Sequence, residues 1–198
     1  MNITSRQFIG SFNSLKELPK TDIPEFCFIG RSNVGKSSLI NFLTGKNDLA
    51  KVSSTPGKTQ SLNYFLLNKE WYLVDLPGYG YARRSKSLRQ DWEKAMYRYF
   101  EERETLVNIF LLIDSRIKPM KSDLEMIEWL GSRGIPFALV YTKADTRELK
   151  QCKINIQVFE DKLSESWDEL PVRFITSSEE RKGKEDILNY ITDCLKIE

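Results

Sequence analysis

Short apolar runs alternate along the chain with segments in which apolar residues recur every three or four positions. This alternation is typical of a mostly parallel sheet with helices on both faces. Several runs are apolar at consecutive positions, as strands buried on both faces are. Six runs predict strands, at residues 25–29, 61–68, 71–75, 106–114, 136–142 and 171–177.

The link between the second and third runs, around Asn68, Lys69 and Glu70, is too short to hold a crossover helix. We therefore expect an antiparallel hairpin there. The predicted fold is an α/β domain with a mostly parallel six-stranded sheet, one antiparallel edge hairpin and helices on both faces. Residues 1–22 are expected to form an N-terminal lead-in or edge segment, and residues 23–198 the domain itself.

Helical periodicity marks three segments in the second half of the chain. Ser122 and Glu125 have the spacing of a capping box, which predicts a helix start. Apolar residues follow at helical spacing in this segment and in two later ones, and we interpret all three stripes as core packing. The stripes are Leu124, Ile127 and Leu130; Leu149, Cys152, Ile156, Phe159 and Leu163; and Ile187, Ile191 and Leu195.

Composition narrows the possible chemistry. The 198 residues include no histidine, which excludes Ser-His and Cys-His nucleophile pairs. The three cysteines show neither a disulfide framework nor a CxxC metal spacing. The formal net charge of +2 is too small to indicate a binding partner. Neither a secretion signal nor a bilayer-spanning apolar run is evident. We expect a cytoplasmic protein without a membrane partner, and a monomer.

Residues 30–37, Gly-Arg-Ser-Asn-Val-Gly-Lys-Ser, match the phosphate-binding pattern G-x-x-x-x-G-K-[ST]. The glycines let successive backbone N–H groups turn toward phosphate oxygens. Lys36 can reach the β- and γ-phosphates of a nucleotide, and the Ser37 hydroxyl can bind Mg²⁺. The motif follows a predicted strand and opens a predicted helix, which is the context that the pattern requires. The pattern alone does not choose between ATP and GTP.

A second motif, Thr142-Lys143-Ala144-Asp145, comes directly off the run at 136–142. Guanine presents adjacent N1–H and N2–H₂ donors, and one carboxylate, that of Asp145, can accept both. The stem of Lys143 can lie along the base plane. The backbone N–H groups of Ser177 and Ser178 can meet the guanine oxygen. The alternative for Asp145 is a helix N-terminal cap.

A third motif, Asp-Leu-Pro-Gly, occupies residues 75–78. Asp75 is expected to hold magnesium through a water and the Gly78 N–H to bond the γ-phosphate, so this segment should respond to loss of that phosphate. The alternative is an ordinary β-turn. In the polar segment 51–60, Thr59 is the best candidate for a second magnesium-binding hydroxyl, and Thr55 is the next.

The amino-acid sequences of these motifs indicate a family. FIGRSNVGKSSLIN, STPGKTQSLNYF, LVDLPGYGYA and YTKAD resemble the EngB/YihA/YsxC family of bacterial ribosome-biogenesis GTPases, in the TrmE-Era-EngA-YihA-Septin-like superfamily. The resemblance covers the chain from about Pro24 to the C-terminal helix. It implies a Ras-like P-loop GTPase domain that binds GTP and GDP with Mg²⁺. It also implies a role in maturation of the large ribosomal subunit and in cell division and septation.

The resemblance also implies site residues. The candidate catalytic residues are Lys36, Thr59 and Gly78, and the implied magnesium ligands are Ser37 and Thr59. The implied GTP contacts are Gly30, Arg31, Ser32, Asn33, Val34, Gly35, Lys36, Ser37, Gly57, Lys58, Thr59, Gln60, Ser61, Asp75, Leu76, Pro77, Gly78, Thr142, Lys143, Ala144, Asp145, Thr176, Ser177 and Ser178.

Tyr79 stands where many such GTPases carry a glutamine that orients the attacking water. A phenol orients water only weakly, and we expect the ring to turn away from the site. Intrinsic hydrolysis is therefore predicted to be slow and to be completed by a partner or an ion. Asn33 is a candidate for binding K⁺ beside the phosphates, and its alternative role is to brace the P-loop backbone.

A basic cluster follows the third motif and consists of Arg83, Arg84, Lys86 and Arg89. Aromatic residues flank it, and basic residues with aromatic stacking suit RNA. These aromatic residues are Tyr79, Tyr81, Trp92, Tyr97 and Tyr99. The alternative is a solvated loop that leads into a helix with core aromatics.

The predicted function is that of a GTP-gated assembly factor for the large ribosomal subunit, bound through ribosomal RNA. A second hypothesis is a GTP-gated protein-binding module of the division machinery, without RNA contact. A third is a P-loop kinase of a small metabolite, which leaves residues 142–145 unexplained.

Overall fold

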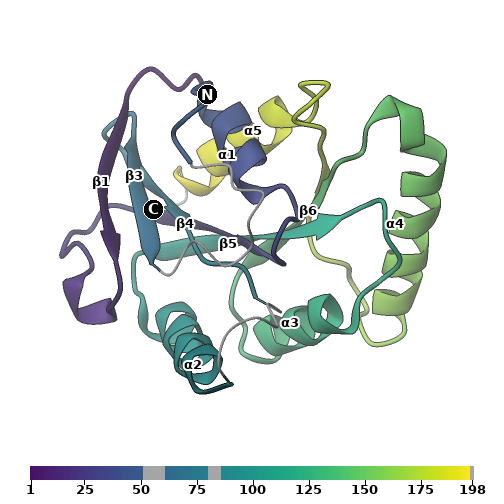
Figure 1. The fold of residues 1–198 in the computed structure, drawn as a ribbon, viewed down its shortest axis with the longest axis horizontal. Coiled ribbons are helices and arrows are strands. Elements are labelled where there is room, and N and C mark those ends of the chain that lie inside the picture. Colours follow the sequence, from purple (N-terminus) through teal and green to yellow (C-terminus); the bar gives the residue numbers. More distant parts are fainter. Residues whose placement is uncertain (51–60, 80–85, 197–198) are drawn as a thin grey trace.

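The computed structural model describes residues 1–50, 61–79 and 86–196. Within these ranges the chain forms a sheet in the order β1-β3-β4-β2-β5-β6-β7, with α-helices on both faces (Figure 1). The strands are β1 (Arg6–Phe12), β2 (Glu25–Gly30), β3 (Leu62–Leu67), β4 (Trp71–Asp75), β5 (Leu106–Asp114), β6 (Phe137–Thr142) and β7 (Arg173–Ile175). The helices are α1 (Lys36–Thr44), α2 (Lys86–Glu102), α3 (Lys121–Ser132), α4 (Leu149–Ser164) and α5 (Lys184–Cys194), with 3-10 turns η1 (Leu15–Glu17) and η2 (Thr146–Glu148).

The predicted α/β fold and its hairpin are confirmed. Strands β4, β2, β5, β6 and β7 run parallel, whereas β3 runs antiparallel to both of its neighbours, β1 and β4. At the tip of the β3–β4 hairpin, Asn68 and Lys69 have φ angles of 53° and 60°. With the Glu70 N–H bonded to the Leu67 oxygen at 3.0 Å, these left-handed residues make the tight turn between the paired Leu67 and Trp71.

The prediction of six strands is wrong by one, because β1 adds a seventh strand within the described residues. It pairs with β3 at the edge of the sheet, so the hairpin lies one strand further in. The pairing register shifts between Phe8 and Gly10. This irregularity breaks the strict alternation of buried and exposed residues by which a strand is recognised in a sequence.

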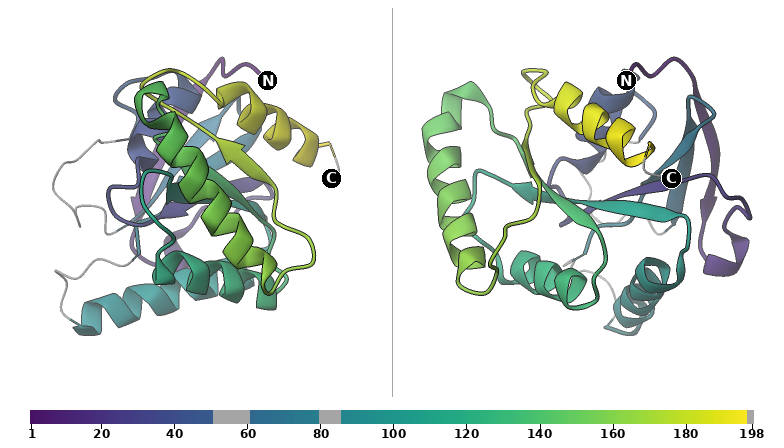
Figure 2. Two further views of the ribbon diagram at one scale, coloured as in Figure 1. Left: turned by 90° about the vertical axis from the view of Figure 1, so that its right-hand side faces the viewer. Right: turned by 180° about the vertical axis from the view of Figure 1, so that it is seen from behind.

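Two hydrophobic cores lie on opposite faces of the sheet. In β2, Cys27 and Ile29 point to the core that α2, α3 and α4 cover, whereas Phe26 and Phe28 point to the core under α1 and α5. Figure 2 shows α1 and α5 on one side of the sheet and α2 and α3 on the other. The three predicted helical stripes contribute to these cores, with Ile127, Phe159 and Ile187 among their buried residues.

The predicted capping box of α3 is wrong. The helix begins at Lys121 with Met120 as its N-cap residue, and no side chain caps it. Ser122 therefore lies inside the first turn and cannot act as the cap. The last predicted strand, 171–177, is also shorter than expected, because only Arg173–Ile175 pairs with β6.

A buried carboxylate ties α2 to the amino end of β2. Glu25 is fully buried and accepts hydrogen bonds from Tyr64 Oη at 2.9 Å, Tyr99 Oη at 2.7 Å, Arg103 Nε at 2.9 Å and Thr105 Oγ1 at 3.0 Å. Removing the guanidinium of Arg103 would leave the charge of Glu25 buried without its counter-ion, which typically costs about 3–5 kcal/mol.

Of the helices in the described ranges, none is both long enough and apolar enough to cross a membrane.

Candidate nucleotide-binding site

The predicted motifs meet at one edge of the sheet. Residue 30 ends β2, residue 75 ends β4, residue 142 ends β6, and β7 stops at residue 175, just before Thr176. These strands are parallel, so their carboxyl ends lie at the same edge, where open α/β sheets bind ligands.

The phosphate loop, residues 30–37, makes a tight turn between β2 and α1. A Cβ atom on Gly30 would lie 2.8 Å from the carbonyl oxygen of Leu112 and 2.9 Å from Val34 Cγ1, so no other residue fits here without a shift. Gly35 has a φ angle of 103° and serves as the N-cap of α1. The first turn of the helix thus follows the loop directly, with its N–H groups available to an anion.

Lys36 and Asp75 contact each other across this loop, and both side chains are largely buried. Burial lowers the pKa of Lys36 to about 8, so the ammonium is still mostly charged at pH 7. The second oxygen of Asp75 accepts a hydrogen bond from Asn63 Nδ2 at 3.3 Å. A phosphate that binds Lys36 would compete with Asp75 for the donors of this ammonium.

The donor set beside Lys36 suits magnesium. Ser37, half-buried at the start of α1, supplies a hydroxyl, and Asp75 supplies a carboxylate. Mg²⁺ prefers such oxygen ligands and usually combines one or two of them with substrate phosphates and water. It therefore does not need a cluster of three or more His, Cys, Asp or Glu side chains, and the described ranges contain none.

The third motif packs directly on the phosphate loop. A Cβ atom on Gly78 would lie 2.8 Å from the carbonyl oxygen of Gly30 and 3.0 Å from the amide nitrogen of Ser32. The next residue, Tyr79, donates its N–H to the Gly30 oxygen at 3.2 Å. Its side chain is only 7% exposed, and its hydroxyl donates to Asp123 Oδ1 of α3 at 2.8 Å. The phenol therefore turns into the protein.

Residues 142–145 and 176–178 form the guanine end of the site, and hydrogen bonds connect these residues to each other and to the phosphate loop. The hydroxyl of Ser177 donates to Asp145 Oδ1. Thr142 Oγ1 donates to the carbonyl oxygen of Val34 at 2.6 Å and so joins this end to the phosphate loop. Asp145 precedes η2 without a side-chain cap bond, which argues against the alternative that it is a helix cap. The N–H of Ser177 is bonded to the Lys182 oxygen at 3.2 Å, which leaves the N–H of Ser178 as the candidate for the guanine oxygen.

Lys143 also bridges the two ends. Its Nζ donates to the carbonyl oxygen of Asn33 at 2.5 Å and to Asp114 Oδ2 at 2.8 Å. Burial opposes the charge of Asp114, but hydrogen bonds from Arg116 and Lys143 outweigh burial and hold the pKa of this carboxyl below its usual range. The ammonium is thereby fixed, and its stem can lie along a base.

Sequence reasoning missed two functional carboxylates and one hydroxyl. Asp114 ends a long apolar strand at the same edge as the motifs, and this position is a signal that would have found it. Asp123 lies in the first turn of α3 outside any motif, and nothing in the sequence marks it. The sequence predicts a role for the backbone of Ser177 only, and nothing in its motif marks the hydroxyl that contacts Asp145.

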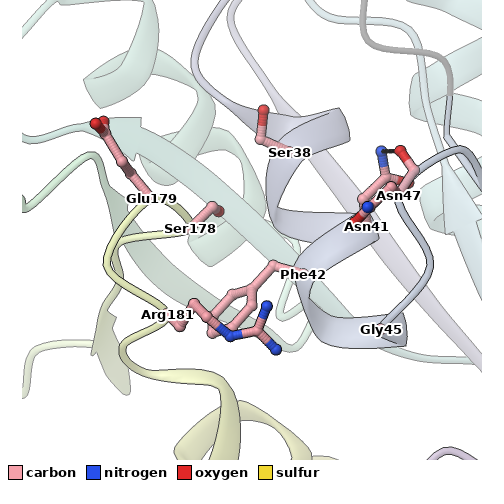
Figure 3. A pocket seen from close by; sticks show the side chains of 8 residues that line it. All are labelled: Ser38, Asn41, Phe42, Gly45, Asn47, Ser178, Glu179 and Arg181. Atoms are coloured by element: carbon pink, nitrogen blue, oxygen red, sulfur yellow. Dashed lines mark hydrogen bonds between the residues drawn. The ribbon is translucent and has the colours of Figure 1, made fainter.

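A hollow of about 360 Å³ lies between the first helix and the loop after β7. Ser38 of α1 and Ser178 of the loop line it, next to two of the predicted segments (Figure 3). At its far side the guanidinium of Arg181 lies 5.8 Å from the centre of the Phe42 ring. The hollow therefore borders both the phosphate loop and the loop that carries Ser178.

Several predicted residues lie outside the described residues. They are Thr55, Gly57, Lys58, Thr59, Gln60, Tyr81, Arg83 and Arg84. Lys86 and Arg89 belong to α2, but their side chains are not described either.

The aromatic part of the predicted RNA surface needs correction. Tyr79 and Tyr99 are buried, and each donates its hydroxyl to a buried carboxylate. Trp92 and Tyr97 pack partly buried against the core under α2 and α3. Tyr79 and Tyr99 cannot stack on bases, because the hydrophobic core already occupies both faces of a buried ring. The predicted basic contacts do not depend on them.

Comparison with known proteins identifies relatives along the whole chain. Residues 25–143 match the MMR_HSR1 family, which is described as 50S ribosome-binding GTPase. A probable GTP-binding protein EngB from Bacteroides fragilis is 54% identical over 196 residues, covering 99% of this chain and 98% of that protein. The protein of the same name from Christiangramia forsetii is 49% identical over 191 residues, with 96% of each chain covered.

Solved structures agree in fold. The crystal structure of a probable GTP-binding protein engB matches with a TM-score of 0.65 and 21% identity, over 88% of this chain and 100% of that chain. An S. thermophilus NFeoB variant bound to GMPPNP matches with a TM-score of 0.61 and 26% identity, over 84% of this chain and 60% of that chain. The Ras-like GTPase fold is thereby confirmed, and the chain belongs to the EngB family of GTP-binding proteins.

Proposed function

We propose that this protein is a GTP-gated assembly factor for the large ribosomal subunit. The observation that carries the proposal is the match of residues 25–143 to a family described as 50S ribosome-binding GTPase. In the GTP state the protein binds a precursor of the subunit in the cytoplasm as a monomer. Hydrolysis of GTP to GDP and phosphate releases it and resets the switch.

Slow intrinsic hydrolysis is part of this proposal, and the position of Tyr79 supports it. The hydroxyl of Tyr79 is engaged with Asp123, so it does not orient an attacking water. Lys36 binds the β- and γ-phosphates, and the Gly78 N–H binds the γ-phosphate. Ser37 and Thr59 would hold Mg²⁺, with Asp75 contacting it through a water, and the ion would neutralise charge on the phosphates.

Completion of the site is assigned to the ribosomal partner or to potassium. The side chain of Asn33 is exposed at the phosphate loop, where it can reach an ion beside the phosphates. Hydrolysis rates measured in KCl and NaCl at matched ionic strength test this part. A higher rate in KCl is expected, and equal rates would exclude a potassium site.

The RNA contact is assigned to Arg83, Arg84, Lys86 and Arg89, which follow the γ-phosphate sensor in the sequence. Replacing all four with Glu should abolish binding to ribosomal particles and leave GTP affinity unchanged. The role in cell division and septation is proposed to follow indirectly from the supply of ribosomes.

Sedimentation through a sucrose gradient tests the proposal. The protein is mixed with ribosomal subunits and their precursors, together with GDP or a non-hydrolysable GTP analogue. Co-migration with large-subunit particles only in the presence of the analogue is expected. Absence of co-migration with either nucleotide would overturn the assembly role and favour a partner protein of the division machinery.

A further inference from the structure

Asp123 joins two segments of the nucleotide site although it belongs to none of the motifs. It lies in the first turn of α3 and is 1% exposed. Arg31 of the phosphate loop donates from Nε to both carboxylate oxygens at 3.1 Å, and Tyr79 donates its hydroxyl to Oδ1 at 2.8 Å. One buried carboxylate therefore holds the phosphate loop, through Arg31, and also holds Tyr79, the residue that follows the third motif.

The charges and burial of this trio make each member depend on the others. A buried carboxylate is costly unless it is paired and hydrogen-bonded. Arg31, whose side chain is 20% exposed, supplies the countercharge. Burial raises the pKa of Tyr79 well above its ordinary value, so its hydroxyl keeps the proton that it donates. Burial still raises the pKa of Asp123 in spite of Arg31 and Tyr79, so loss of either partner leaves this carboxylate even less well compensated.

The backbone continues the same connection. Tyr79 bonds through its N–H to Gly30 at 3.2 Å, and Arg31 and Tyr79 form an isolated parallel bridge. Gly78, one residue earlier, lies so close to the loop that it has no room for a Cβ atom. The side chain of Tyr79 is thus anchored one residue away from the N–H group proposed to sense the γ-phosphate.

We propose that Asp123 is a positioning residue for recognition of the γ-phosphate: by binding Arg31 and Tyr79 it holds the Gly78 N–H against the phosphate loop. The inference rests on the proposed contact between Gly78 and the γ-phosphate. GDP has no γ-phosphate, so the anchor raises affinity for GTP and leaves affinity for GDP unchanged. It also gives Tyr79 a function, because the phenol that replaces the glutamine acts as the anchor of this segment.

The test compares two nucleotides on the full chain. Dissociation constants for GDP and for a non-hydrolysable GTP analogue are measured for Tyr79→Phe and Asp123→Asn. Each variant should bind the analogue about tenfold more weakly, the effect typical of losing a hydrogen bond to a charged group. GDP affinity should stay within about twofold of the wild-type value. The double variant should lose no more than the more affected single variant, because both changes break the same connection.

Tyr99→Phe is the matched control. Its hydroxyl also donates to a buried carboxylate, that of Glu25 at 2.7 Å, but Glu25 lies at the amino end of β2, away from the site. This variant should lower thermal stability to a similar extent without changing the ratio of the two affinities. A purely structural role of Asp123 would weaken GDP and the analogue in equal proportion, and that result would overturn the proposal.

Gly78→Ala displaces the proposed sensor directly, because its Cβ atom would lie 2.8 Å from the Gly30 oxygen and 3.0 Å from the Ser32 nitrogen and so push the Gly78 N–H away from the loop. If it weakens binding of the analogue selectively while Tyr79→Phe and Asp123→Asn do not, the γ-phosphate contact stands and the role of Asp123 is wrong. If none of the three variants changes the ratio, both the anchor and the sensor are wrong. Failure of co-sedimentation with ribosomal particles affects neither result, because these affinities are measured without particles.

Discussion

The guanine end and the phosphate end of the site are assembled in different ways. At the guanine end, Asp145 is oriented by Ser177, and Lys143 by Asp114. These contacts leave the second oxygen of Asp145 and the stem of Lys143 for a base, so they need not break when guanine binds. At the phosphate end, by contrast, the ammonium of Lys36 is engaged with Asp75, so a phosphate competes with an existing contact.

This difference separates recognition from switching. A preorganised base pocket would favour guanine in every nucleotide state, because contacts that are already in place do not have to form when the base binds. A phosphate end that rearranges can respond to the number of phosphates, since each ligand shifts the equilibrium by its differential affinity for the two arrangements. Thr142 Oγ1 and Lys143 Nζ donate hydrogen bonds to carbonyl oxygens of the phosphate loop. These bonds fix the position of the guanine end relative to the phosphate end.

Asp145→Asn should have the largest effect and tests the guanine end. An amide carbonyl accepts the N1–H but its NH₂ group faces the N2–H₂ donors of guanine, whereas the 2-oxo group of xanthine would accept from it. The ratio of affinities for GDP and xanthosine diphosphate should change about 1000-fold in favour of xanthine. Competition binding against a fluorescent nucleotide measures the ratio.

The exposed Asp193 of α5, which pairs with Lys196 at 3.0 Å, supplies the matched control Asp193→Asn, which should leave the ratio unchanged. Equal weakening of both nucleotides by Asp145→Asn would mean that Asp145 shapes the loop instead of reading the base.

Lys36→Ala should have the second-largest effect and tests the phosphate end. GDP and a GTP analogue should both bind about 100-fold more weakly, because a charge-assisted hydrogen bond to phosphate is lost. Isothermal titration calorimetry measures both affinities. Lys121→Ala is the control, since Lys121 is 89% exposed and forms only a surface pair with Glu125. Unchanged GDP affinity in Lys36→Ala would contradict the phosphate contact and would mean that Lys36 stays on Asp75 in the wild-type complex.

Ser177→Ala should act at the guanine end by about tenfold. The variant keeps the backbone but loses the hydroxyl that orients Asp145 and that accepts a hydrogen bond from the Glu180 N–H at 2.9 Å. GDP should bind about tenfold more weakly, with little change in affinity for a triphosphate chain that lacks a base. Ser164→Ala removes another hydroxyl bonded within the protein, to the Glu160 oxygen at 3.0 Å, and should have no effect on GDP. An equal loss in both variants would contradict the orienting role.

Local sequence patterns are enough to predict most strands and helices of the fold and most residues of the guanine end. The buried strands read as apolar runs, and Gly30 and Asp145 stand in motifs whose spacing is fixed by the chemistry of phosphate and guanine. The connections between elements could not be read in the same way. Asp123 contacts Arg31 across 92 positions of the sequence, and only the packing of α3 against the phosphate loop creates that contact. Strand β1 lies within the expected lead-in or edge segment 1–22, but it is not among the six predicted strands, because its bulge interrupts the alternation.

Glu180 supports the smallest prediction, a pH effect at the guanine end. It accepts hydrogen bonds from the Thr146 N–H at 2.7 Å and from Lys182 Nζ at 2.6 Å, so it braces the loops that carry Asp145 and Ser177. Hydrogen bonds from Lys182 and Thr146 lower the pKa of Glu180 to about 2. Because this pKa is depressed in the folded state, its contribution to stability is complete above the ordinary glutamate range and is lost as the pH falls toward 2.

Glu180→Gln should therefore lower the melting temperature slightly at pH 7 and progressively less as the pH falls below about 4. The effect should stay small because the carboxylate of Glu180 is still accessible to water, and added salt should reduce it further. Thermal melts of the wild type and the variant at several pH values measure the difference. Glu165→Gln removes a carboxylate from the end of α4, outside these loops, and should show no such trend. A constant difference at every pH would mean that the amide disturbs the loop packing and that the charge of Glu180 does not contribute.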